Sequence, residues 1–144
     1  MTFVLVSSTD STDSRYSLSL VTSGAFLYSS YNFVNLKASP SAYFSIAEAL
    51  DESDLDAISI EDAHRPNDLK LLEIFKKTSV IMGLIDVAKS KLEEVDQITE
   101  RIQECLNHID PHRLIAAPDC GLGLLNRQLA IDKMKNLCKA AHSI

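Results

Sequence analysis

From residue 39 to the C-terminus, the sequence alternates between helical and strand patterns, and this alternation restricts the fold more than any other feature. Four segments carry apolar residues at the three- and four-residue spacing of one helix face. They begin near Ser39, Leu69, Val95 and Asn126. Between them lie three short runs rich in apolar residues, at 55–61, 80–85 and 114–117. The order helix, strand, helix, strand, helix, strand, helix predicts an α/β domain with a parallel sheet.

The middle run, residues 80–85, consists of apolar residues and one glycine. That composition is typical of a strand buried on both faces of a parallel sheet. In such sheets, chemistry takes place beyond the carboxyl ends of the strands. The three loops that follow the predicted strands are therefore the places where a site is expected. They comprise residues 61–66, 86–91 and 118–123.

Three residues in these loops are the candidate zinc ligands. Glu61 ends the first strand, His64 follows three residues later, and Cys120 lies in the third loop. A catalytic zinc takes about three such ligands and keeps one position open. Each residue also has an ordinary interpretation: Glu61 as a solvated or capping carboxylate, Cys120 as a small packed thiol, and His64 as an exposed loop residue.

The last helix is predicted from about Asn126 to His142. Its expected inward face consists of Leu129, Ala130, Met134, Leu137, Cys138 and Ala141. Lys133, Lys135 and Lys139 fall on its later turns, where cations interact favourably with the helix dipole. Cys105, on the apolar stripe of the preceding helix, is predicted to lie in the core, as is Cys138.

Charge and composition exclude several classes of function. The chain has 14 basic and 20 acidic residues, a net charge of −6, so binding to nucleic acid is not expected. No apolar run is long enough to span a membrane. The first ten residues lack the pattern of a secretion signal, and three cysteines form no disulfide framework. We therefore expect a cytoplasmic protein with reduced thiols.

Residues 1–38 differ from the rest of the chain because they are rich in serine and almost uncharged. Short runs at 3–6, 17–22 and 26–34 predict either weak strands or a poorly ordered segment. The sequence thus divides into a divergent segment, 1–38, and an α/β region, 39–144.

Four segments of the chain resemble one known protein family. The stretch Arg113–Gly123, with sequence RLIAAPDCGLG, resembles the C-terminal catalytic domain of cobalamin-independent methionine synthase. The segments at 56–61 (DAISIE) and 83–87 (GLIDV) resemble two strands of that domain. The segment at 133–137 (KMKNL) and the alanines that follow at 140 and 141 resemble its final helix. The resemblance covers about residues 43–144.

The resemblance implies a fold and an activity. The fold is a TIM (β/α)8 barrel, of which the chain would span roughly the C-terminal half, because a whole barrel needs roughly 250 residues. The activity is methyl transfer from 5-methyltetrahydrofolate to the sulfur of homocysteine. A zinc ion binds that sulfur and lowers its pKa. By position, Glu61 and Cys120 match two of the family's zinc ligands.

The sequence departs from the family pattern at the other two ligands. The family's H-x-C motif would fall near residues 37–39, which read Lys-Ala-Ser, and no histidine or cysteine precedes Glu61. His64 is a candidate third ligand. A family histidine that assists proton transfer falls at about Ala88.

Three hypotheses therefore remain open. The first is a zinc-dependent methyltransferase domain, with an activity that two missing ligands call into question. The second is a non-catalytic, truncated barrel that acts as an interaction module and self-associates through exposed sheet edges. The third is an unrelated small α/β domain that binds an anion with Gly121 and Gly123 at the start of the last helix.

Overall fold

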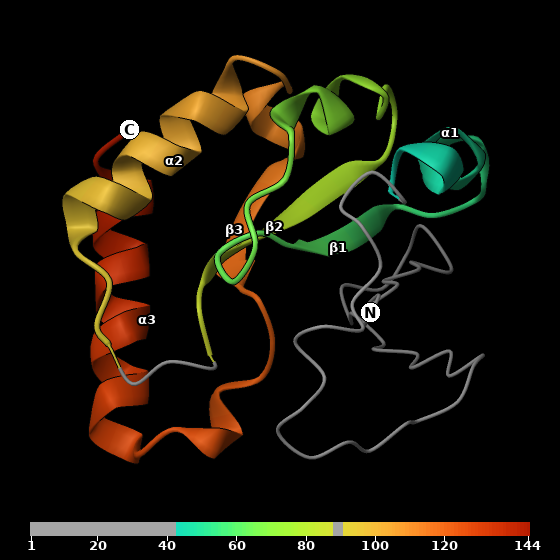
Figure 1. Cartoon of the computed structure of the whole chain (residues 1–144). Helices are drawn as coiled ribbons and strands as arrows, with labels where there is room; N and C mark the ends of the chain where they lie inside the picture. The colour runs from blue at the N-terminus through green and yellow to red at the C-terminus, as the bar shows by residue number, and fades with distance from the viewer. Residues whose placement is uncertain (1–42, 88–90) are drawn as a thin grey trace, which may run out of the picture.

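A computed structural model describes residues 43–87 and 91–144, which form a single layer of strands covered by helices (Figure 1). The runs at 3–6, 17–22 and 26–34, the helix start at Ser39 and the position of Ala88 lie outside the described residues. None of the helices in the described part is both long and apolar enough to cross a membrane.

The described elements follow the predicted alternation. The strands β1 (Ala57–Glu61), β2 (Ser79–Ile85) and β3 (Leu114–Pro118) form one parallel sheet in the order β1-β2-β3. The α-helices are α1 (Phe44–Glu52), α2 (Val95–Leu106) and α3 (Arg127–His142). The described residues also contain three short 3₁₀ helices: η3 (Leu69–Glu73), η4 (Pro111–Arg113) and η5 (Leu122–Leu124).

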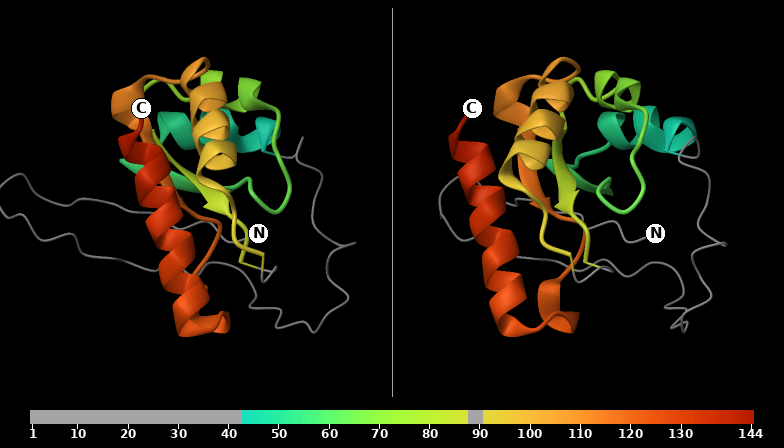
Figure 2. Two further views of the ribbon diagram at one scale, coloured as in Figure 1. Left: turned by 90° about the vertical axis from the view of Figure 1, so that its left-hand side faces the viewer. Right: turned by 60° about the vertical axis from the view of Figure 1, so that its left-hand side comes forward.

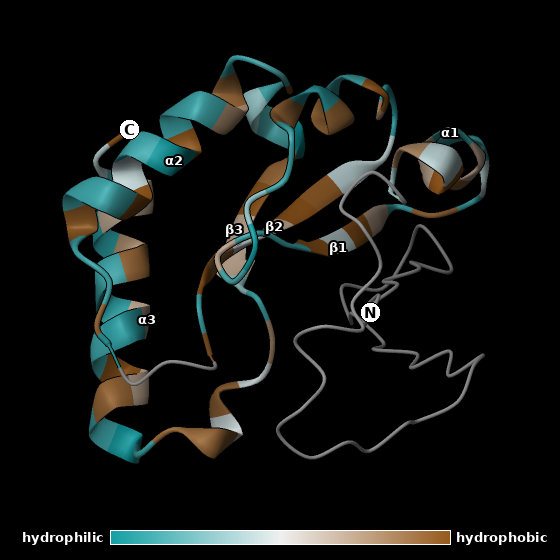
Figure 3. Ribbon diagram, viewed as in Figure 1, coloured by the Kyte–Doolittle hydropathy of each residue, from teal (hydrophilic) through white to brown (hydrophobic). Residues whose placement is uncertain are grey.

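One face of the sheet packs against the helices and forms the core. Ile58 and Ile60 of β1 pair in register with Val80 and Met82 of β2, and all four are almost completely buried. These apolar positions show as brown stretches of the strands in Figure 3. The helices contribute residues such as Ala47, Ile98 and Leu137 to the same cluster. Both views of Figure 2 show α2 and α3 side by side on this face.

The opposite face of the sheet is less covered. Ile81 of β2 is only partly buried, and its β3 partner Ile115 is 46% exposed. Residues that alternate along a strand point to opposite faces, so Glu61 at the end of β1 belongs to this second face. The candidate ligand therefore lies away from the apolar core.

Two details of the helices differ from the predictions. The segment after Pro66 is a 3₁₀ helix of five residues, Leu69–Glu73, too short for a regular α-helix. The helical spacing of apolar residues that begins at Val95 continues to Ile109, but α2 ends at Leu106, and Ile109 is buried beyond its end.

The inward face of α3 was predicted incorrectly at four positions: 133, 138, 140 and 141. Cys138 is exposed, and Ala140 rather than Ala141 is buried. Lys133 is completely buried, with its Nζ 2.8 Å from both carboxylate oxygens of Glu93 and 2.9 Å from the Asp86 carbonyl oxygen. An ammonium group can be buried when charged and polar partners replace its water. These partners lie in the loop after β2. The periodicity of α3 alone therefore could not predict that Lys133 is buried.

Candidate functional site

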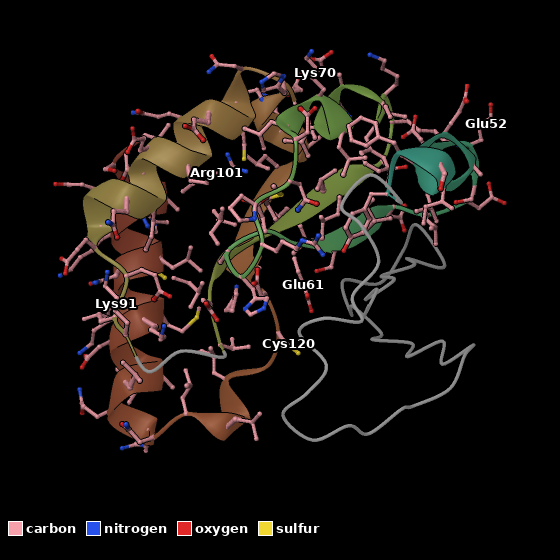
Figure 4. The ribbon with its side chains drawn as sticks, viewed as in Figure 1. Glu52, Glu61, Lys70, Lys91, Arg101 and Cys120 are labelled. Atoms are coloured by element: carbon pink, nitrogen blue, oxygen red, sulfur yellow. The ribbon has the colours of Figure 1, made fainter. Side chains whose placement is uncertain are left out.

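The carboxyl ends of the three strands bring Glu61 and Cys120 to one edge of the sheet. Glu61 is paired in register with Gly83 of β2, and Gly83 is paired with Ala117 of β3. Cys120 follows three residues after Ala117. Figure 4 shows both labelled side chains at this end of the sheet. Glu61 is half-buried and Cys120 is exposed, so both groups are accessible from solvent.

Asp119 connects the two loops that carry these residues. One of its carboxylate oxygens accepts hydrogen bonds from the backbone N–H groups of Asp62, at 3.0 Å, and Ala63, at 3.1 Å. Its second oxygen accepts one from the N–H of His64, at 2.8 Å. The residue before Cys120 thus holds the three residues that follow Glu61.

Gly83 makes room for this contact. A Cβ atom placed at Gly83 would lie 2.8 Å from the Cα of Asp119 and closer still to its Oδ1. Such an approach does not occur between real atoms, and a backbone shift would be needed to relieve it. The middle strand therefore requires glycine at the level where the two loops meet.

The electrostatics of this edge are dominated by buried and neighbouring acids. Burial raises the pKa of Asp119, the nearby Glu61 carboxylate raises it further, and the three backbone hydrogen bonds oppose this rise. Burial also raises the pKa of Tyr43, with additional repulsion from Glu61 and Asp119. Tyr43 therefore lies close to both carboxylates.

A second acid, Asp62, fixes the loop after β1 from the other side. Arg101 of α2 donates to both of its carboxylate oxygens, at 2.7 and 3.0 Å. The backbone N–H of Asn67 donates to Asp62 at 2.7 Å, and the Asn67 amide donates to the Glu61 carbonyl oxygen at 2.7 Å. The hydrogen bonds to Asp62 raise the pKa of the Arg101 guanidinium. The backbone around Glu61 is thus held on two sides.

His64 is only partly brought into this arrangement. Its Nδ1 lies 3.8 Å from Asp86 Oδ2, at the end of β2, and is buried without a hydrogen-bond partner. An imidazole nitrogen without a hydrogen-bond partner can act as a metal ligand. The contact with Asp86 directs this nitrogen toward the end of β2.

The residues at this edge fit part of a zinc site. A carboxylate and a thiol are donors of the kinds that zinc binds. Within residues 43–87 and 91–144, however, no three His, Cys, Asp or Glu side chains gather closely enough to hold a metal ion. The described residues therefore provide two suitable donors, Glu61 and Cys120, and not a complete coordination sphere.

The supporting residues of this edge were not predicted from the sequence. Asp119 immediately precedes Cys120, and Asp62 immediately follows Glu61, so their positions in the sequence are the only signal that could have drawn attention to them. The residues that bond to these two carboxylates lie between 39 and 57 residues away along the chain, apart from Asn67, and no local sequence pattern indicates such contacts.

Comparison with known proteins relates most of the chain to one family. Residues 35–143 match the family described as "Cobalamin-independent synthase, Catalytic domain". The methionine synthase of Pyrococcus abyssi is 31% identical over 112 residues, which cover 77% of this chain and 33% of that protein. The 5-methyltetrahydropteroyltriglutamate–homocysteine methyltransferase of a Synechococcus strain is 31% identical over 107 residues, 72% of this chain and 14% of that protein. The chain thus spans a third or less of the length of these relatives.

A solved structure shows the same relationship in three dimensions. A B12-independent methionine synthase from Shewanella sp. W3-18-1, in complex with selenomethionine, superimposes with a TM-score of 0.67 and 27% sequence identity. The superposition covers 70% of this chain and 30% of that one. The expected α/β class with parallel strands is therefore confirmed, and the open three-stranded sheet matches part of a larger domain.

Proposed function

Because the chain belongs to the cobalamin-independent methionine synthase catalytic-domain family, we propose that it serves methyl transfer from 5-methyltetrahydrofolate to the sulfur of homocysteine. The observation that carries the proposal is the placement of Glu61 and Cys120 at the carboxyl edge of the sheet, joined through Asp119. In this proposal the chain acts in the cytoplasm.

In this proposal, Glu61 and Cys120 are the zinc ligands of the chain. Zinc, when bound, lowers the pKa of a substrate thiol, so that a thiolate is available at neutral pH. The protein's own contribution is to hold the two donors in place: Asp119 fixes the loop after β1 from one side, and Arg101 with Asp62 from the other. His64 is proposed as a third ligand, because its Nδ1 is buried without a hydrogen-bond partner. To fill that role it would have to move closer to Glu61 and Cys120, because no three such side chains gather within the described residues.

The missing H-x-C motif limits what this chain does alone. Two donors make half of a four-ligand site, and the residues at 37–39 supply none of the others. We therefore expect weaker zinc binding than in a complete site. Glu61 and Cys120 alone do not suffice for methyl transfer, which also needs further zinc ligands and contacts to the substrates.

A zinc titration of the metal-free, full-length chain tests the proposal. Competition with a chromophoric chelator should give saturable one-to-one binding that is lost in Cys120→Ala and weakened in Glu61→Gln. Cys138→Ala is the matched control, because Cys138 is also an exposed thiol but lies on α3. Absence of saturable binding, or equal losses in Cys120→Ala and Cys138→Ala, would overturn the proposal.

A second candidate function, an interaction module, is favoured by the exposed apolar surface. Ile115 on the edge strand β3 is 46% exposed, and Leu124 in η5 is 94% exposed. A groove of about 800 Å³ beside η5 and α3 is lined mainly by apolar side chains, including Leu122, Ile131 and Met134. Edges and patches of this kind favour association with another chain.

Sedimentation velocity distinguishes the two candidates. An interaction module should self-associate as concentration rises, and Ile115→Lys with Leu124→Lys should return it to a monomer. A monomer at every concentration, combined with one-to-one zinc binding, would favour the first candidate.

A further inference from the structure

Asp119 contacts the loop that follows one proposed zinc ligand, Glu61, and directly precedes the other, Cys120, in the sequence. Through its three backbone hydrogen bonds it contacts each residue from Asp62 to His64, directly after Glu61. Through the peptide bond that follows, it carries Cys120. Its own N–H donates to the Ile85 carbonyl oxygen at 3.0 Å, which ties it to the end of β2 as well.

The contact is built into the sheet rather than into a flexible surface loop. Asp119 is 9% exposed, so its hydrogen bonds are sheltered from competing water. Ala63 donates its N–H to the Gly83 carbonyl oxygen at 2.9 Å, on the same middle strand that must lack a side chain for Asp119 to fit. The carboxylate and the backbone N–H of Asp119 thereby join the ends of all three strands.

We propose that Asp119 is a positioning residue that sets the separation and orientation of Glu61 and Cys120, with Gly83 providing the space in which it does so. The inference rests on the proposed zinc-binding function of that pair. Groups that orient metal ligands without touching the metal change metal affinity by ten- to a hundredfold when they are removed.

Asp119→Asn is the most informative substitution. Its amide oxygen can still accept the N–H groups of Asp62 and Ala63, whereas its amide nitrogen would face the N–H of His64, donor against donor. We expect zinc affinity, measured by chelator competition at a temperature where circular dichroism shows a folded protein, to fall ten- to a hundredfold. Amide hydrogen exchange at His64, whose N–H loses its acceptor, should accelerate in the metal-free protein.

Gly83→Ala tests the same inference without altering any polar group. The added Cβ displaces Asp119, so zinc affinity should fall as in Asp119→Asn. Gly123→Ala is the matched control, because nothing lies within 4 Å of a Cβ at that position, and it should bind zinc as the unmodified chain does. Cys120→Ala and Glu61→Gln should lose zinc affinity but keep slow exchange at residues 62–64.

The outcomes separate the positioning role from the zinc site itself. If the unmodified chain does not bind zinc, the proposed function fails, and this inference with it. If it binds zinc, and folded Asp119→Asn and Gly83→Ala bind it equally well, only the positioning role is overturned. If neither variant folds, Asp119 and Gly83 are structural requirements and the positioning role is again overturned.

Discussion

At the scale of single residues, backbone-binding carboxylates organise both ends of the sheet. Asp119 does so at the carboxyl end. At the amino end, Asp51 of α1 accepts hydrogen bonds from the N–H groups of Lys76 and Thr78, both at 2.9 Å, and of Lys77 at 3.2 Å. Burial raises the pKa of Asp51, but these hydrogen bonds outweigh it and lower the pKa below its ordinary value.

The lowered pKa of Asp51 gives a testable dependence of stability on pH. Its contribution is fully present above the ordinary aspartate pKa of about 3.9 and is lost as pH falls through the lower folded-state pKa. Asp51→Asn should therefore reduce the free energy of unfolding by about 1–3 kcal/mol at neutral pH. The difference from the unmodified chain should shrink in acid.

Urea unfolding at neutral pH and at about pH 3 measures this difference. Comparing the two proteins at each pH isolates the contribution of Asp51 to the free energy of unfolding. The contribution of Asp119 changes with pH in the opposite direction, because its pKa is raised. Asp54→Asn, at an exposed site near α1, is the control and should change little. If Asp51→Asn reduces the free energy of unfolding equally at both pH values, the pKa of Asp51 is not lowered in the folded chain.

At the scale of elements, the sequence predicted the helices and strands well because their periodic apolar positions are local signals. Cys105 and the strand at 80–85, except for the partly buried Ile81, were correctly assigned to the core on that basis. The contacts that join elements were not predictable in the same way. Lys133, Asp119 and Arg101 acquire their roles from partners between 34 and 57 residues away. Cys138 was placed wrongly because the packing of α3 leaves that side of the helix in solvent.

The ion pair between Lys133 and Glu93 should anchor α3 to the loop after β2. Lys133→Met removes one partner and leaves a partly buried carboxylate, which we expect to reduce the free energy of unfolding by about 3 kcal/mol. Lys135→Met, two residues away and with a side chain 61% exposed, should change it by less than about 0.5 kcal/mol. Chemical denaturation measures both, and equal stabilities for the two variants would show that the buried pair does not anchor the helix.

At the scale of the whole molecule, the described residues form an open parallel sheet with its core on one face and the proposed ligands at one edge. The three cysteines differ in burial according to this arrangement. Cys105 is completely buried, and burial raises the pKa of its thiol to about 11, whereas Cys120 and Cys138 are exposed. Thiolates react faster than thiols, so burial and the raised pKa both protect Cys105.

Titration with a thiol reagent should therefore find two fast-reacting cysteines in the folded chain and a third only after denaturation. Mass spectrometry of the labelled peptides would identify Cys105 as the slow one. Rapid labelling of Cys105 in the absence of denaturant would mean that α2 does not pack as described.

X-ray absorption at the zinc edge tests most directly whether Glu61 and Cys120 hold zinc. The chain loaded with one equivalent of zinc should show one sulfur at about 2.3 Å with lighter donors at about 2.0–2.2 Å. The sulfur should disappear in Cys120→Ala and remain in Cys138→Ala. A spectrum with no sulfur neighbour, or with sulfur that persists in Cys120→Ala, would show that Cys120 is not a zinc ligand.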